Sequence, residues 1–339
     1  MSEVTLADRR SPMRSLTGVQ VIGTGSYLPD NVVRNEDLAA RGFDADWILQ
    51  RSGIRERRHA PPEIATSDLA AEAAQRCLAD SGVDPSEIDL VLVGTLSPDY
   101  LMPSVACQVQ DRLGLCCAAA DISAACAGFL YTLVTGMQYV ATGCSRRALV
   151  IGADCNSRVT NPDDKKTFPL FGDGAGAVLL APGDASQGMV SYTLGSDGSG
   201  VKLLHRPVGG SRAPFDPQRL DGQSWFVQMD GRSVFKWAVR LLARTITDVL
   251  DQANCSIGDV DLWLLHQANA RIIDAAADNL QIARDRLVIH IDRYGNTSAA
   301  SVPIALDESI REGRVARGDL LLMSGFGAGL SWGTTLFRW

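Results

Sequence analysis

The sequence feature that most constrains the fold is an internal similarity between two distant parts of the chain. Segment 83-VDPSEIDLVLVGT-95 resembles 255-CSIGDVDLWLLHQ-267, and segment 148-ALVIGAD-154 resembles 320-LLLMSGF-326. Both pairs are separated by the same 172 residues. Because apolar strands often resemble one another by chance, the shared spacing carries more weight than either pair alone. We therefore predict two halves that share one topology.

Short apolar runs alternate with longer helical patterns, which favours an α/β architecture built around buried strands. Strands are predicted at 19–25, 89–95, 148–154, 175–181, 261–266, 287–291 and 320–325. Helices are predicted at 67–82, 126–143, 233–253 and 298–313. Residues 1–15 are mostly polar and are expected to form a flexible extension, followed by the two halves at 16–185 and 186–339.

The charge of the chain limits its partners. A formal net charge of -7 and a pI near 5.2 argue against a general nucleic-acid binder, which needs a strong basic field. No run reaches the roughly 18 apolar residues of a membrane span, and the start has no apolar export segment. We expect a cytoplasmic protein with no nucleic-acid and no membrane partner.

The cysteines and histidines give no metal-binding pattern. The eight cysteines contain no CxxC pair, which is typical of a reduced protein rather than of a disulfide framework or a zinc knuckle. The four histidines show no HExxH spacing. No metal site is predicted.

One cysteine has a distinctive setting. In 121-DISAACAGFL-130, Cys126 lies among alanines and a glycine where a strand leads into a helix. The positive end of a helix stabilises a thiolate, and small neighbours would let a thioester approach the sulfur. The alternative is that Cys126 is an ordinary buried core residue.

Three other segments could contribute chemistry. His266 and Asn269 follow a predicted strand, Asn296 lies in 292-DRYGNTSAASVP-303, and 325-GFGAGLSWG-333 follows the last predicted strand. Each has a simpler explanation: a structural histidine, a turn-forming asparagine and a flexible loop. The 172-residue spacing places Ser298 opposite Cys126, so the two turns could face each other at equivalent strand ends.

The order of these motifs resembles that of β-ketoacyl-acyl-carrier-protein synthase III, a thiolase-fold condensing enzyme. The motifs are ACAGF, HQAN, GNTSAASVP and a terminal G-x-G-x-G-x-x-W-G. The resemblance runs from about Gly18 to Trp339 and includes 23-GTGSYLP-29, 47-WILQRSGIRER-57 and 171-FGDGAGA-177. It implies a thiolase-like five-layer αβαβα fold with an internal pseudo-duplication, in agreement with the repeat found independently.

The resemblance also implies a reaction and a catalytic triad. Cys126, in the first half, would take an acyl group from an acyl-CoA, most simply acetyl-CoA, and the N–H groups of Cys126 and Ala328 would hold the oxyanion. His266 and Asn296, in the second half, would stabilise the enolate formed when malonyl-acyl-carrier protein loses carbon dioxide. The product would be a 3-oxoacyl carrier protein that initiates type II fatty-acid synthesis, with no organic cofactor or metal.

Further positions match binding residues of the family. The residues expected to contact CoA are Trp47, Arg51, Lys165 and Asn269. Lys236 and Arg271 match basic positions where an acidic acyl carrier protein would dock. Met102 lies in a loop that, in the family, reaches into the acyl pocket of a partner subunit, so a homodimer is expected.

Two features leave alternatives open. Ala328 stands where the family usually has glycine, and its methyl group narrows the approach to the oxyanion position. Met102 stands where the family often has phenylalanine, so a longer or branched primer is an alternative to acetyl-CoA. The rival enzyme is a ketosynthase III-like condensing or acyl-transfer enzyme of secondary metabolism. The presence of both His266 and Asn296 favours decarboxylative condensation. A cysteine hydrolase would explain Cys126 and His266 but not GNTSAASVP or the CoA-like segment. A non-catalytic binding protein of this fold is the last alternative, and acylation of Cys126 by acetyl-CoA would exclude it.

Overall fold

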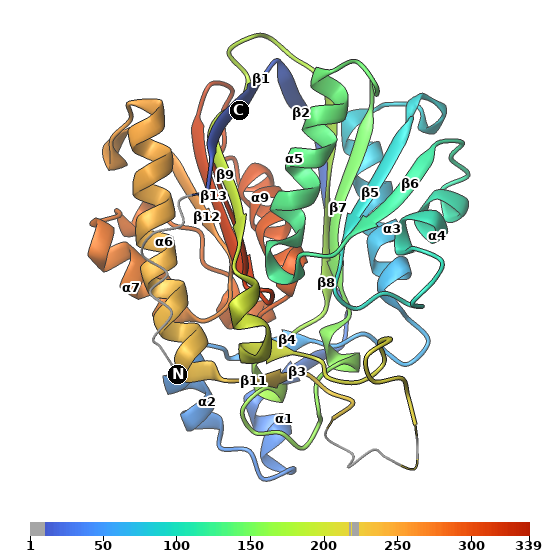
Figure 1. Ribbon diagram of the computed structural model, residues 1–339, viewed down its shortest axis with the longest axis vertical. Coiled ribbons are helices and arrows are strands. Elements are labelled where there is room, and N and C mark those ends of the chain that lie inside the picture. The colour runs from blue at the N-terminus through green and yellow to red at the C-terminus, as the bar shows by residue number, and fades with distance from the viewer. Residues whose placement is uncertain (1–10, 217, 219–223) are drawn as a thin grey trace.

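The protein folds into alternating layers of helices and sheets. The computed structural model describes residues 11–216, 218 and 224–339. Helices α3 (Thr66–Ser81) and α4 (Val105–Arg112) cover one sheet, and α6 (Gly231–Ala253) and α7 (Ala270–Leu280) cover the other. Helices α5 (Gly128–Ala141) and α9 (Ser301–Arg311) lie between the two sheets (Figure 1). This is the predicted thiolase-like αβαβα arrangement.

Four strands of each sheet share one order, and the fifth strand lies at opposite edges of the two sheets; the shared order confirms the predicted pseudo-duplication. The first sheet runs β2 (Val19–Tyr27), β8 (Gly174–Pro182), β7 (Ala148–Asp154), β5 (Leu90–Gly94), β6 (Ala118–Ile122). The second sheet runs β1 (Met13–Thr17), β9 (Gly188–Ser196), β14 (Ser331–Arg338), β13 (Leu320–Gly327), β12 (Leu262–Leu265). In both sheets the equivalent pairs β5/β7 and β12/β13 are parallel, whereas β7/β8 and β13/β14 are antiparallel.

Each sheet is buried on both faces, which explains why the strand sequences are continuously apolar. In β5, Leu90 and Leu92 pack into the central layer, whereas Val91 and Val93 pack under α3 and α4. In β12, Leu262 and Leu264 face the centre while Trp263 and Leu265 face α6 and α7. The alternation places the apolar core on both sides of each sheet.

The remaining elements gather at one end of the molecule, the lower end in Figure 1. They are β3 (Val32–Arg34), α1 (Asn35–Ala39), α2 (Ala45–Ser52), β4 (Glu56–Arg58), β10 (Leu204–His205), β11 (Gln228–Met229) and the short α8 (Ile291–Tyr294). Strand β3 pairs with β4, and β10 pairs with β11. Neither pair of strands is part of the two large sheets.

Two predicted segments differ from the structure. The residues from Met13 onward do not belong to a flexible extension, because β1 pairs with β9 and Leu16 packs against the central core; residues 1–10 of that predicted extension lie outside the described part. The strand predicted at 287–291 is reduced to one bridge between Leu287 and Trp263. The backbone N–H groups of His290 and Ile291 instead donate to Gln267 Oε1, and α8 begins there.

The helices predicted at 67–82, 126–143, 233–253 and 298–313 correspond to α3, α5, α6 and α9. Cys126 and Ser298 lie just before their helices, in the 3₁₀ turns η2 (Ala125–Ala127) and η8 (Ser298–Ala300). Within the described residues, no helix is both long enough and apolar enough to cross a bilayer, and no three acidic, cysteine or histidine side chains are grouped as metal ligands. All eight cysteines are free thiols.

Candidate active site

Two equivalent turns bring the candidate residues together. Turn η2 leads directly into α5, and turn η8 leads directly into α9. Each begins with a non-glycine residue at positive φ, Ala125 at 47° and Ser298 at 54°. Ser298 is therefore the conformational counterpart of Ala125, one residue earlier than the strand spacing predicts. The predicted approach of the turns is present, because the Ser298 hydroxyl donates to Cys126 Sγ at 3.3 Å.

The Cys126 thiol lies in a nearly closed site. The residue is 8% exposed, and its burial raises the pKa of the thiol to about 12 although Ser298 donates to the sulfur. Desolvation therefore outweighs the stabilisation expected from the helix terminus in the resting protein. The glycine-rich segment packs against the same turn, since a Cβ at Gly327 would lie 2.7 Å from Cys126 N. A side chain at position 327 would prevent this close approach, so the position requires glycine.

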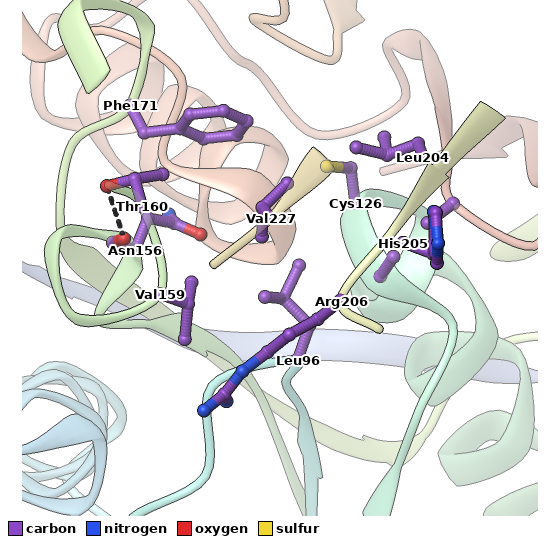
Figure 2. A pocket seen from close by; sticks show the side chains of 12 residues that line it. Leu96, Cys126, Asn156, Val159, Thr160, Phe171, Leu204, His205, Arg206 and Val227 are labelled. Atoms are coloured by element: carbon purple, nitrogen blue, oxygen red, sulfur yellow. Dashed lines mark hydrogen bonds between the residues drawn. The ribbon is translucent and has the colours of Figure 1, made fainter. Parts of the chain in front are cut away.

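Cys126 and Ala328 line one cavity of about 130 Å³ (Figure 2). Ala328 lies in the turn between β13 and β14. Ala328 is not among the described non-glycine residues with positive φ, which are Ala125, Asn254, Gln281 and Ser298. Its φ is therefore one that any residue can adopt, and the position does not require glycine for its backbone conformation. The other lining residues are Leu96, Asn156, Val159, Thr160, Phe171, Leu204, His205, Arg206 and Val227.

His266 follows β12 and is almost completely buried. Its Nδ1 lies 2.6 Å from the Ser301 hydroxyl, and its ring meets the edge of Phe326 with 5.4 Å between centroids. Burial, together with the nearby His290, lowers the pKa of His266 to about 3. The imidazole is therefore neutral at physiological pH and can donate from one nitrogen while it accepts at the other.

Asn296 is held on both its backbone and its side chain. Its N–H donates to Leu170 O at 2.8 Å, and its carbonyl accepts from Gly172 N at 3.0 Å. Its Oδ1 accepts from the backbone N–H of Ser298 at 2.8 Å. This bond orients the side-chain amide and leaves Nδ2 as its hydrogen-bond donor. Segment 296–301 thus contacts Cys126 through Ser298 and His266 through Ser301.

Three residues around Cys126, His266 and Asn296 were not among the predicted site residues. Ser298 was expected opposite Cys126 but was given no role in the site, and Ser301 reads in the sequence as an ordinary small residue at a helix start. Asp154, at the end of β7, is fully buried; its Oδ1 accepts from Thr95 Oγ1 at 2.9 Å and its Oδ2 accepts from Ala299 N at 3.1 Å. The signal for Asp154 was present, because a carboxylate that ends an apolar strand needs buried partners.

The predicted CoA contacts lie mainly where α2 meets the start of α7. Trp47 is 43% exposed, and the Arg51 guanidinium lies 5.9 Å from the centroid of its ring. Asn269 Nδ2 donates to Arg51 O at 3.0 Å, which joins these residues into one group. Lys165 is exposed in a different loop, beside Gly42 in the segment that leads into α2.

The predicted docking residues lie on two helices that pack together. Lys236 is exposed on α6, and the guanidinium of Arg271, at the start of α7, lies 5.5 Å from the ring centroid of the adjacent Phe235. Met102 lies in the loop between β5 and α4, is 84% exposed, and follows the equally accessible Leu101.

The comparisons with known proteins agree with one another. The family model for 3-oxoacyl-[acyl-carrier-protein (ACP)] synthase III matches residues 120–198, and the model for the C-terminal part of that family matches residues 250–339. A β-ketoacyl-[acyl-carrier-protein] synthase III of Rhodopirellula baltica is 53% identical over 345 residues, covering 96% of this chain and 100% of its own length.

Solved structures extend this similarity to the fold. The crystal structure of 3-oxoacyl-[acyl-carrier-protein] synthase III from Aquifex aeolicus has a TM-score of 0.86 and 40% identity, covering 95% of this chain and 100% of its own. A priming β-ketosynthase from a polyketide biosynthetic pathway has a TM-score of 0.88 and 35% identity, covering 98% and 99%. The chain therefore belongs to the β-ketoacyl-acyl-carrier-protein synthase III family of thiolase-fold condensing enzymes, as its motifs predict.

Proposed function

We propose that the protein condenses an acyl-CoA primer, acetyl-CoA in the simplest case, with malonyl-acyl-carrier protein. The reaction would release carbon dioxide and give the 3-oxoacyl carrier protein that starts type II fatty-acid synthesis. The observation that carries the proposal is that segment 296–301, which begins with Asn296, contacts both Cys126 and His266. The family to which the chain belongs supports the same reading.

In the first half-reaction, Cys126 Sγ attacks the thioester carbonyl of the primer. A new sulfur–acyl bond forms as the bond to CoA breaks, and the thiol proton leaves Cys126 while CoA departs as a thiol. The Ser298 hydroxyl, 3.3 Å from Sγ, stabilises the charge that develops on the sulfur. The N–H groups of Cys126 and Ala328, both in the cavity wall, are the proposed oxyanion donors.

In the second half-reaction, His266 and Asn296 stabilise the enolate. If the Ser301 hydroxyl donates to Nδ1 of the neutral imidazole, Nε2 carries the proton and donates to the enolate oxygen. Asn296 Nδ2 is the second donor, since its Oδ1 is occupied by Ser298 N. The carbanion then attacks the acyl-Cys126 carbonyl, and the thiolate leaves. Every step uses side-chain or backbone groups of this chain, without a metal or organic cofactor.

The same proposal covers the partners. The group of Trp47, Arg51 and Asn269, with Lys165 nearby, would hold CoA, whereas Lys236 and Arg271 would attract the acidic carrier protein. The exposed apolar loop that contains Met102 supports a homodimer interface, since a monomer rarely leaves such side chains in water. The eight free thiols support a reducing, cytoplasmic location.

We also propose that the halves divide as 16–185 and 186–339. This division assigns the nucleophile turn to the first half and both enolate donors to the second. It is supported by the order that four strands of each sheet share.

The test is mass spectrometry of the Cys126 peptide after exposure to a panel of acyl-CoAs, followed by addition of malonyl-acyl-carrier protein. We expect an acetyl adduct on Cys126 and then a 3-oxoacyl carrier protein. The proposal is wrong if no acyl-CoA modifies Cys126, or if the adduct forms and no condensation product follows.

A second function is favoured by one comparison. The similarity to a priming ketosynthase of a polyketide pathway supports a role in secondary metabolism, with a longer or branched primer. The same panel distinguishes the two functions, because a branched or longer acyl-CoA would then load faster than acetyl-CoA.

A further inference from the structure

The hairpin of β10 and β11 forms part of the wall of the cavity beside Cys126. Leu204 and His205, which make up β10, line this cavity, and so does Val227, which immediately precedes β11. The N–H of Val227 donates to Val159 O at 2.9 Å and so joins the hairpin to another part of the wall. The next residue after β10, Arg206, also lines the cavity.

Arg206 is fixed by Trp225 in two ways. Its guanidinium carbon lies 4.0 Å from the centroid of the indole ring, and its Nε donates to the Trp225 carbonyl at 2.8 Å. The Phe215 ring packs edge-on against the same indole, with 5.1 Å between centroids. A guanidinium stacked on an aromatic face and bonded to the same residue is held in one orientation. The Arg206 side chain is therefore a fixed part of the wall.

The aliphatic stem of Arg206, rather than its charge, faces the cavity. Figure 2 shows this side chain extended away from Cys126, with its guanidinium beyond the ring of lining residues. Leu96, Val159 and Val227, which line the same cavity, are apolar. An arginine in this position buries its methylene groups along the apolar surface while its charged end stays near water.

We propose that the stack of Arg206 on Trp225 closes the primer cavity and restricts the acyl group on Cys126 to short chains. This inference rests on the proposed function, because the group that fills the cavity is the acyl chain joined to Cys126 Sγ. A chain that extends from the sulfur across the cavity meets the Arg206 stem. A longer chain fits only if the stack is displaced, which breaks the Nε bond and separates the guanidinium from the indole.

The experiment compares loading of Cys126 by acetyl-, butyryl-, hexanoyl- and octanoyl-CoA in the full-length protein, followed by mass spectrometry. The measured quantity is the loading rate of each longer primer divided by that of acetyl-CoA. In Arg206→Ala this ratio should rise about fourfold for each methylene that newly fits, which corresponds to about 0.8 kcal/mol. Trp225→Ala should change the ratio in the same direction, because it releases the arginine.

Two further variants separate shape from charge and from general effects. Arg206→Met keeps an unbranched stem but removes the charge and the Nε bond, so its ratios should lie between those of the wild-type protein and those of Arg206→Ala. Arg212→Ala removes an exposed arginine of the same loop that does not line the cavity, and its ratios should not change.

Three outcomes would overturn the inference. Unchanged ratios in both Arg206→Ala and Trp225→Ala, with normal acetyl loading, would show that the stack does not limit the primer. Equal effects of Arg206→Met and Arg206→Ala would show that charge is what matters. Faster loading of the wild-type protein by succinyl-CoA than by butyryl-CoA, lost in both arginine variants, would make Arg206 a carboxylate-binding residue. Absence of loading by every acyl-CoA would reject the proposed function itself.

Discussion

The turns before α5 and α9 have the same backbone geometry and carry different chemistry. Each is a 3₁₀ turn that starts at positive φ and runs straight into a helix between the sheets. The second residue of the first turn is Cys126, whereas the second residue of the other turn is Ala299, whose N–H donates to Asp154. The two turns are in contact, since a Cβ at Gly128 would lie 3.3 Å from Ala299 Cβ.

The difference shows how a duplicated fold can divide a two-step reaction. The first turn presents the proposed nucleophile. The second turn presents no nucleophile, but the segment around it carries Asn296 and contacts His266 through Ser301. A common backbone thus holds two sets of groups face to face, and in the proposed mechanism each set serves one half-reaction. Changes confined to one turn should therefore affect one half-reaction more than the other.

The largest effect is expected from Cys126→Ser, which alters the first turn alone. A hydroxyl is a far weaker nucleophile than a thiol without an adjacent base, so acylation and condensation should fall by at least about 10³-fold. Decarboxylation of malonyl-acyl-carrier protein should persist, because the second turn is intact. Mass spectrometry of the products and release of carbon dioxide measure the two processes. Cys144→Ser, at an exposed cysteine, is the control and should behave as wild type.

The second largest effect is expected from Asn296→Ala, which alters the segment that leads into the second turn. Loss of one oxyanion donor should lower decarboxylation by about 10²- to 10³-fold while Cys126 is still acylated. The two rates are measured separately, as acyl-Cys126 formation and as release of carbon dioxide. Asn279→Ala, at an exposed position of α7, serves as the control. Equal losses in both half-reactions would contradict the separation of roles between the turns.

A smaller effect is expected from Ser301→Ala. The variant removes the hydroxyl 2.6 Å from His266 Nδ1, which frees the ring to change its tautomer or orientation. Condensation should fall about tenfold through this loss of positioning, with little change in acylation. Ser309→Ala is a matched control, because this buried serine of α9 donates only to the helix carbonyl of Ala305. A similar fall in both serine variants would indicate a general weakening of α9 instead.

Much of this comparison was predictable from the sequence, and the rest depends on contacts that sequence spacing does not encode. The repeat predicted two equivalent turns because buried strands keep their apolar pattern in both halves. The sequence analysis missed β1, because this strand has no continuous apolar run. Leu16 packs against the central core, whereas Arg14 and Ser15 are exposed. The strand predicted at 287–291 was lost to the side chain of Gln267, a tertiary contact that overrides local propensity.

The candidate active site was also only partly predictable from the sequence. Cys126, His266 and Asn296 were predicted because their motifs are specific and ordered. Ser301 was not, because a serine in a helix is unremarkable until the structure brings it to a histidine 35 residues away. The state of the thiol was also mispredicted: the helix terminus favours a thiolate, but burial raises the pKa of Cys126 to about 12. Desolvation depends on the whole surrounding fold, so local sequence does not report it.

The smallest expected effect concerns His266, which contacts the segment of the second turn. We expect the pH profile of decarboxylation to show no inflection that belongs to this histidine. A pKa lowered from 6.5 to about 3 keeps His266 neutral at every pH well above 3, so its donor form does not change between about pH 5 and 8. The decarboxylation rate in single turnovers should therefore show no fall near pH 6.5 that belongs to this histidine. An inflection there that disappears in His266→Asn would contradict a neutral donor. It would mean instead that the imidazole gains a proton in the range where the enzyme works, and that its burial is relieved when substrate binds.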